Sequence, residues 1–375
     1  MQAQDTNNND ERVDLYDLTF DQLQTFLTET IGEPKFRTKQ VFRWLYEHEV
    51  RDFSSMTNLS KATRAKLEKH STVGTMHLLN QEISEDGTRK LLFQLQDGRS
   101  VESVVIPSLT DHRVTLCISS QVGCALGCKF CYTATMGPGR NLRVGEFLGQ
   151  FLGANQLLEE GQKITNVVFM GMGEPLVNFS NLLSTLNLLT DKRGIGLGAR
   201  RLTVSTAGLI PQILKLKEQY KVRLAISLHA TTDGLRNEIM PINQRYPLKE
   251  LVKALRTFQE GRRLPITLEY TLMEGINDSM LDARRLRKIA LSIPGKTKVN
   301  LIPFNEHPGA PYKRPEWEAI QEFRAEVDSP HLTVTMRTPR GDDISAACGQ
   351  LAIQGQNKKP RSKAQNAPLH RRYQA

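Results

Sequence analysis

The most constraining feature of this 375-residue chain is a run of three cysteines, Cys124, Cys128 and Cys131, spaced as C-x3-C-x2-C. Three thiolates this close together can each bind one iron of a [4Fe–4S] cluster. Because no fourth cysteine lies nearby, the remaining iron would stay open to a substrate or cofactor. A structural zinc site usually has a second pair of ligands, and none accompanies this run. The run therefore predicts a cluster with an open iron, with zinc as the competing interpretation.

Segments typical of strands and helices alternate over most of the chain. We expect strands at 114–118, 166–170, 201–205, 222–227, 266–271, 299–303 and 332–336. Helical periodicity marks the stretches between them, at 144–160, 179–190, 210–219, 248–259 and 279–292. This alternation predicts a parallel α/β architecture. Sites in such folds lie at the carboxyl ends of the strands, and the cysteine run follows the first strand directly.

Two further patterns precede this core. Apolar residues recur at helical spacing over 18–70, with basic residues between them at 36–46, which predicts a small helical domain. This domain either binds RNA or only packs against the core. Asp97-Gly98 lies between two alternating runs and predicts a β-hairpin. We expect a disordered N-terminus (1–14), a helical accessory RNA-binding domain (15–72), a β linker (73–109), the α/β core with a catalytic C-terminal loop (110–351) and a basic disordered tail (352–375).

Charge and cysteine content narrow the class of protein. Six of the ten net positive charges lie in residues 355–375, which contain no acidic residue. Such a tail favours a polyanion such as RNA, or it only keeps the chain soluble. No apolar run reaches the ~18 residues that a membrane span needs, and the polar, acidic N-terminus is unlike a signal peptide. Five cysteines do not make a disulfide scaffold, so we expect the reducing cytoplasm.

Two cysteines lie outside the run. Cys117 comes just before it, and Cys348 lies in a segment of small residues beyond the last expected strand. That position suits a mobile loop that brings a thiolate into the site, and cytosolic thiols that form a transient disulfide are usually catalytic. Inert buried thiols are the alternative.

The cysteine spacing resembles that of the radical S-adenosyl-L-methionine (SAM) superfamily, in which the open iron binds the amino and carboxylate groups of SAM. The resemblance implies an open, partial (β/α)6 barrel. The segment 171–175, Gly-Met-Gly-Glu-Pro, follows an expected strand and resembles the superfamily segment that meets the SAM amino group. Ser205, Ser227 and His229 end two further strands, where they can reach the SAM ribose or carboxylate, and Asn305 can reach its adenine or ribose in the same way.

Taken together, the motifs resemble the RlmN family of dual-specificity adenine-C2 methyltransferases of 23S rRNA and tRNA. The matching segments are 36–46, 121–131, 140–142, 171–175, 227–230, 300–303 and 340–351. The resemblance implies three cluster ligands, Cys124, Cys128 and Cys131. It implies SAM contacts at Glu174, Pro175, Ser205, Ser227, Leu228, His229 and Asn305. Tyr132, directly after the last ligand, departs from the smaller residues of relatives, so packing beside the cluster differs here.

The resemblance also implies a reaction that uses two SAM molecules per turnover and all five cysteines. Cys348 takes a methyl group from one SAM, and its methyl carbon, activated with a second SAM, is joined to the adenine of RNA. Cys117 then removes a proton and closes a disulfide with Cys348. Glu102 falls at the family's proton acceptor, although an exposed hairpin glutamate is the alternative. The implied setting is a cytoplasmic monomer with 23S rRNA and tRNA as substrates and a flavodoxin-like electron donor.

Three other functions compete with this interpretation. Methylation at adenine C8, as in the Cfr type, uses the same cysteines. A radical SAM enzyme that activates a glycyl radical enzyme would leave Cys117 and Cys348 idle. A metal-stabilised RNA-binding module without catalysis has no need of a SAM site, so the segment 171–175 argues against it.

Overall fold

Seven parallel strands form the core, in the order in which they occur in the sequence. The computed structural model describes residues 12–337 and 340–351. The strands are β6 (Val114–Cys117), β7 (Asn166–Phe169), β8 (Leu202–Thr206), β9 (Arg223–Ser227), β10 (Ile266–Leu272), β11 (Thr297–Pro303) and β12 (Thr333–Met336). Each neighbouring pair is parallel. The predicted parallel α/β architecture is therefore present, and all seven expected strands form within one or two residues of their predicted bounds.

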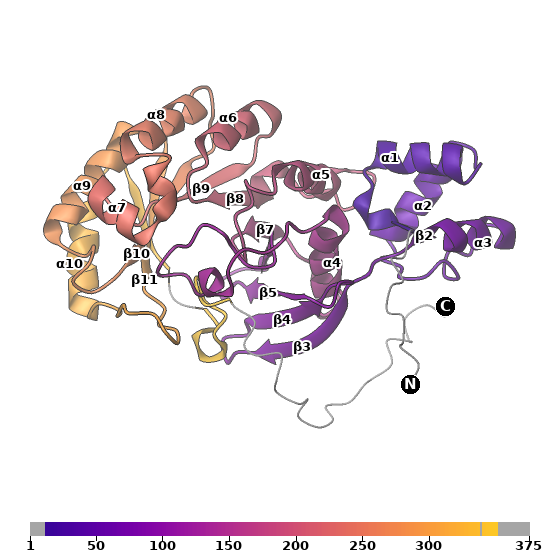
Figure 1. Ribbon diagram of the computed structural model, residues 1–375, viewed down its shortest axis with the longest axis horizontal. Helices are drawn as coiled ribbons and strands as arrows, with labels where there is room; N and C mark the ends of the chain where they lie inside the picture. The colour runs from indigo at the N-terminus through magenta and orange to yellow at the C-terminus, as the bar shows by residue number, and fades with distance from the viewer. Residues whose placement is uncertain (1–11, 338–339, 352–375) are drawn as a thin grey trace, which may run out of the picture.

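Helices follow the strands and cover the outside of the sheet (Figure 1). They are α4 (Val144–Asn155), α5 (Phe179–Thr190), α6 (Ile210–Gln219), α8 (Leu248–Gln259), α9 (Met280–Ser292) and α10 (Trp317–Val327). In α8 the buried residues Leu248, Leu251, Leu255 and Phe258 recur every three or four positions, so one stripe faces the core. The expected helix 144–160 ends earlier, at Asn155, where the chain turns and the Asn155 side chain accepts the Ile164 amide.

Short elements complete the core. A short helix α7 (Asp233–Ile239) after β9, as well as α10, was not predicted. The remaining short turns are η1 (Leu15–Asp17), η3 (Tyr132–Met136), η4 (Ala199–Arg201), η5 (Pro241–Gln244) and η6 (Asp342–Ile344). No helix among the described residues is long and apolar enough to cross a membrane.

The β linker continues the same sheet. Strands β3 (His77–Ile83), β4 (Arg89–Gln94) and β5 (Ser100–Pro107) are antiparallel, and β5 pairs with β6. The predicted hairpin between β4 and β5 is confirmed: the Leu95 amide donates to the Arg99 carbonyl at 2.7 Å, and Gly98 has a φ of 78°. Strand β3 was not predicted. Because β5 lies beside β6, side chains of the linker reach the start of the cysteine-bearing loop.

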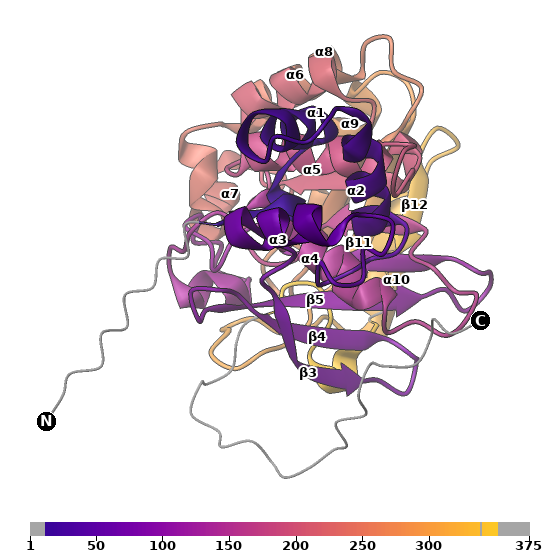
Figure 2. The same ribbon diagram turned by 90° about the vertical axis from the view of Figure 1, so that its right-hand side faces the viewer.

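The N-terminal helices pack at one end of the sheet (Figures 1 and 2). They are α1 (Phe20–Thr25), the π-helical turn η2 (Phe26–Thr30), α2 (Phe36–Tyr46) and α3 (Lys61–His70), with β1 (Val13–Asp14) paired to β2 (Ser71–Thr72). Helix α2 buries Val41, Phe42 and Leu45. The basic tail and most of the expected disordered N-terminus lie outside the described residues.

Candidate active site

A cavity of about 160 Å³, the main cavity, lies at the carboxyl ends of the parallel strands. It brings together most of the residues predicted from the sequence: Cys124, Cys128, Cys131, Glu174, Pro175, Ser205, Ser227, His229 and Cys348. The unpredicted residues that line it include Phe130, Glu269 and Arg337. The strand-end location expected for a parallel α/β fold is therefore confirmed.

The cysteine loop, residues 118–143, carries three thiols to this cavity between β6 and α4. Burial raises the pKa of Cys124 to about 11 and raises those of Cys128 and Cys131 as well. Buried thiols of this kind ionise when a metal binds them. No three His, Cys, Asp or Glu side chains in the described part of the chain converge on a single ion. A [4Fe–4S] cluster takes each thiolate on a separate iron, so this donor set fits the cluster.

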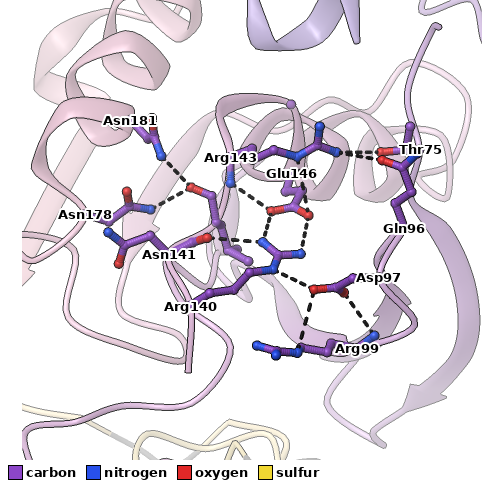
Figure 3. Close-up of polar contacts among 12 residues, drawn as sticks. Thr75, Gln96, Asp97, Arg99, Arg140, Asn141, Arg143, Glu146, Asn178 and Asn181 are labelled. Atoms are coloured by element: carbon purple, nitrogen blue, oxygen red, sulfur yellow. Dashed lines mark hydrogen bonds and ion pairs between the residues drawn. The ribbon is translucent and has the colours of Figure 1, made fainter. Parts of the chain in front are cut away.

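The neck of the cysteine loop is closed by a network of polar contacts (Figure 3). Gln121 and Asn141 form a β-bridge, and the Gln121 side chain donates to Asn141 Oδ1 at 2.8 Å. Arg140 donates two hydrogen bonds of 2.7 Å to the buried Glu146 and one of 2.6 Å to Asp97 in the β4–β5 turn. Glu146, and then Asp97, raise the pKa of Arg140. The loop is thus held at its base by these side chains and by main-chain hydrogen bonds from Val122 to Arg140 and from Leu142 to Ser120.

The same network reaches the N-terminal region. Arg143 donates to Asp17 at 3.1 Å, and Asp17 also accepts the Gly145 amide at 2.7 Å. The other end of the Arg143 guanidinium donates to Thr75 and, more weakly, to Gln96 (Figure 3). The neck therefore joins the cysteine loop, the β4–β5 turn and the N-terminal helices.

Glu174 is a buried carboxylate that accepts only backbone and hydroxyl hydrogens. Its oxygens accept the amides of Leu176 at 3.0 Å and Ala207 at 2.8 Å. Burial raises its pKa to about 7, and no cation contacts it in residues 12–337 and 340–351. A carboxylate that is buried and has no cation beside it fits the ammonium group of SAM.

Gly171 lets the chain that precedes Glu174 pass close to β6. A Cβ on Gly171 would lie 2.8 Å from the Ile118 carbonyl, so only glycine is accommodated here.

His229 lines the main cavity and is held neutral. Its Nδ1 accepts the Thr271 amide at 3.0 Å, so its hydrogen lies on Nε2, which remains as a donor for a ligand. Burial, together with the nearby Arg236, lowers its pKa to about 3. Its φ of 52° lies in the left-handed region, a strained backbone that is common at functional sites.

Cys348 lies at the boundary between two cavities. It lines the main cavity and also a second cavity of about 70 Å³, which Cys117 lines from the end of β6. Both thiols are free. Burial, and then the charge of Cys348, raise the pKa of Cys117 to about 12, whereas Arg337 opposes this rise. The structure thus brings together two cysteines that are 231 positions apart in the sequence.

Comparison with known proteins identifies the family. The family model of the ribosomal RNA large subunit methyltransferase N-terminal domain matches residues 13–73, and that of the radical SAM superfamily matches residues 118–286. A dual-specificity RNA methyltransferase RlmN of Geotalea uraniireducens is 47% identical over 341 residues, which cover 91% of this chain and 97% of that protein. One from Pelobacter propionicus is 48% identical over 342 residues, with 91% and 96% covered. The chain belongs to the RlmN family.

A solved structure agrees with this assignment. The crystal structure of a radical SAM methyltransferase from Sphaerobacter thermophilus has a TM-score of 0.86 and 40% sequence identity, covering 90% of this chain and 99% of that one. The predicted radical SAM barrel is thereby confirmed. As a member of the RlmN family, the chain is a radical SAM RNA methyltransferase that uses a [4Fe–4S] cluster and SAM. The zinc interpretation and the non-catalytic binding module are therefore excluded.

In this RlmN-family chain, the loop that carries Cys348 is tied to the cysteine loop. The Tyr132 amide donates to the Gly349 carbonyl at 2.8 Å, and the Thr133 hydroxyl donates to the Leu351 carbonyl at 2.6 Å. The ring of Tyr132 stacks on His307 at 4.8 Å between centroids. Tyr132, which was expected to change the packing beside the cluster, therefore lies against the aromatic ring of His307.

Besides Cys117, three predicted residues lie away from the wall of the main cavity. Glu102 is buried on β5, only 6% exposed, so the interpretation of an exposed hairpin glutamate is wrong. It lies 3.9 Å from Lys90, whose ammonium donates to the Ile344 carbonyl in the Cys348 loop. Leu228 is fully buried in the core, and Asn305 lines a neighbouring pocket.

Sequence reasoning missed three charged residues of the site, Arg236, Glu269 and Arg337. Glu269 lies within β10 and accepts a hydrogen bond of 2.6 Å from Asn300. Arg337 follows β12, and its pKa is raised first by Cys348 and then by Glu269. The position of Arg337, directly after the expected strand 332–336, was a usable signal, whereas Glu269 lies inside an expected strand. Arg236 lies on the unpredicted helix α7, where no sequence pattern distinguished it from a surface arginine.

Proposed function

We propose that this chain methylates carbon 2 of adenine in 23S rRNA and in tRNA, and that Cys348 carries the methyl group. One observation carries the proposal: the sulfur-bearing residue Cys348 lines both the main cavity and the second cavity that holds Cys117. A methyl group received on one side can therefore be presented to a base without leaving the residue. Relatives named dual-specificity RNA methyltransferases support RNA as the substrate.

The chemistry of adenine explains the need for such a carrier. Carbon 2 of adenine is electrophilic, so a polar methyl transfer from SAM does not reach it. When bound, the cluster and SAM supply a methyl cation equivalent and a carbon-centred radical. Cys124, Cys128 and Cys131 would hold the cluster, and Glu174 would accept hydrogen bonds from the SAM ammonium. The Cys348 sulfur would hold the methyl group and then the adenine.

Cys117 would complete the reaction by closing a disulfide with Cys348, which releases the methylated base. A thiol with a pKa of about 12 is protonated at pH 7, so Cys117 must first lose its proton before it accepts one from the base. Arg337, which favours the charged form of Cys117, supports this step. The buried Glu102 is the second proposed proton acceptor.

The substrate must present an unpaired adenine. Sites of this depth receive a base only from a loop or after it has been unstacked. The N-terminal helices, which expose Lys39 and Arg43 on α2, would hold the rest of the RNA. A flavodoxin-like protein would donate electrons in the cytoplasm, and the chain would act as a monomer.

The test is an assay of the cluster-reconstituted protein with methyl-deuterated SAM and protein-free 23S rRNA or tRNA. Mass spectrometry of the nucleosides is expected to show 2-methyladenosine that carries two of the three deuterium atoms. An intact trideuterated methyl group would refute the methyl-cysteine carrier. 8-Methyladenosine would favour the Cfr-type reaction, and unmodified RNA with an active cluster would point to another radical SAM substrate, such as a glycyl radical enzyme.

A further inference from the structure

Arg236 on α7 is an arginine that is 0% exposed and that no carboxylate contacts in the described part of the chain. Its guanidinium donates four hydrogen bonds of 2.7 to 3.0 Å. The acceptors are the main-chain carbonyls of Ala207, Ser227 and Leu228 and the side-chain carbonyl of Asn243. All four acceptors are neutral, so the hydrogen-bonding groups are satisfied while the charge is not.

A buried charge without an opposite charge is costly, typically by several kcal/mol. Burial lowers the pKa of Arg236 to about 10, which still leaves it charged at pH 7. The carboxylate of Asp233 lies behind Asn243, from which it accepts a hydrogen bond of 2.9 Å, and it also accepts the Leu248 amide. Asp233 is thus separated from Arg236 by one amide group and is already bound by two donors.

Arg236 lies beside the cysteine loop. The Lys129 amide donates to the Ile239 carbonyl at 3.0 Å, which ties the loop to the end of the helix that carries Arg236. Cys128 packs against an apolar cluster that includes Ile239 and Met240. The buried charge of Arg236 therefore lies close to this part of the loop in a medium of low polarity, where electrostatic effects are strong.

We propose that Arg236 is the internal counter-charge of the iron–sulfur cluster and raises its reduction potential. A cluster held by three thiolates is anionic, and one electron from an external reductant adds one more negative charge. A fixed cation stabilises the reduced form more than the oxidised form, because the reduced form carries the larger negative charge. The same guanidinium positions the carbonyl ends of β8 and β9 around the SAM site. This inference rests on the proposed cluster ligands but not on the RNA substrate.

The experiment compares three variants of the full chain, purified anaerobically and reconstituted with iron and sulfide. R236Q removes the charge, R236K keeps the charge but loses the planar fork, and R245Q removes an exposed arginine a few residues away. Iron and sulfide contents are measured first. The midpoint potential is then determined by titration with dithionite, with the reduced cluster followed by electron paramagnetic resonance.

We expect a more negative midpoint potential in R236Q, and values close to that of the unaltered protein in R236K and R245Q. A fully loaded R236Q with an unchanged potential overturns the inference. Equal shifts in R236Q and R236K also overturn it, because the hydrogen bonds and not the charge would then be responsible. If R236Q does not fold, R236K decides: a large shift in a folded R236K contradicts the proposal. If the unaltered protein binds no iron, the assignment of the cluster ligands is contradicted as well. If R236Q has a normal cluster with an unchanged potential, only the inference about Arg236 is contradicted.

Discussion

The side-chain amide of Asn305 donates a hydrogen bond of 3.0 Å to the main-chain carbonyl of Cys348. Arg314 donates to the amide oxygen of Asn305 at 3.3 Å, which fixes the orientation of the amide. Asn305, two positions after the end of β11, therefore holds the main chain of the residue proposed to carry the methyl group. Asn305 was also predicted to contact SAM. That contact remains a prediction, whereas the hydrogen bond to Cys348 is present in the structure.

Removing the hydrogen bond between Asn305 and Cys348 should slow the methylation of Cys348. A hydrogen bond of this kind contributes about 1 kcal/mol, so we expect N305A to lower the rate of Cys348 methylation about fivefold. The measurement is the mass of the intact protein over time in a single turnover with SAM. If Asn305 acts through SAM and not through the loop, the affinity for SAM falls instead and the rate at saturating SAM is unchanged. Q244A, an exposed amide on η5, should match the unaltered protein.

The two relay cysteines should have opposite phenotypes. C117A leaves no thiol to release the product, so a covalent adduct between Cys348 and RNA should accumulate. C348A removes the carrier and should form no adduct at all. Denaturing electrophoresis with labelled RNA distinguishes the two. Release of methylated RNA at normal yield by either variant is incompatible with the relay.

Glu174 should make the stability of the SAM-free protein depend on pH. Its pKa is about 7 in the folded chain and near 4.5 in an unfolded one, so between these values only the folded form binds the proton. The free energy of unfolding should therefore fall as the pH rises from 4.5 to 7, by on the order of 3 kcal/mol. E174Q lacks this contribution.

The measurement for Glu174 is urea unfolding of both proteins at several pH values. As the pH rises, the unaltered protein should lose stability relative to E174Q. If the difference in unfolding free energy between the two proteins does not vary with pH, burial does not perturb the pKa of this carboxyl. E174Q should also lose affinity for SAM.

The stability of the protein should depend strongly on Arg140, which closes the neck of the cysteine loop. R140A removes two charged hydrogen bonds from Glu146, which is 1% exposed and keeps only the Arg143 amide at 2.8 Å and the Arg143 guanidinium at 3.8 Å, a change that should cost about 3 kcal/mol. R193A removes an arginine from the more exposed pair with Asp191 and should cost about 1 kcal/mol or less. Urea unfolding measures both, and iron content after reconstitution should fall in R140A alone. Equal losses of stability would mean that the neck is no more than a surface contact.

Local patterns account for what was correctly predicted. The Asp97-Gly98 turn and the strands of the core depend on neighbours in the sequence, and their bounds agree with the structure. Helix α7 was missed because it is short and its buried residues include the polar Arg236, which weakens the apolar pattern. An exposed Glu102 stood as the alternative to a proton acceptor because the hairpin pattern does not reveal that Lys90, which also contacts the Cys348 loop, lies next to it.

The sequence by itself determined the chemistry that the chain can support: three cysteines at cluster spacing, a glycine-rich turn with Glu174, and two spare thiols. Each of these lies within a few residues of the chain, where spacing and side-chain type are sufficient. Only the tertiary structure decided which residues act together. It placed Cys348 beside Cys117 and between two cavities, closed the cysteine loop with Arg140 and Glu146, and buried Arg236 on a helix that contacts this loop. Contacts between residues far apart in the sequence arise from the order and direction of the strands, which no local pattern records.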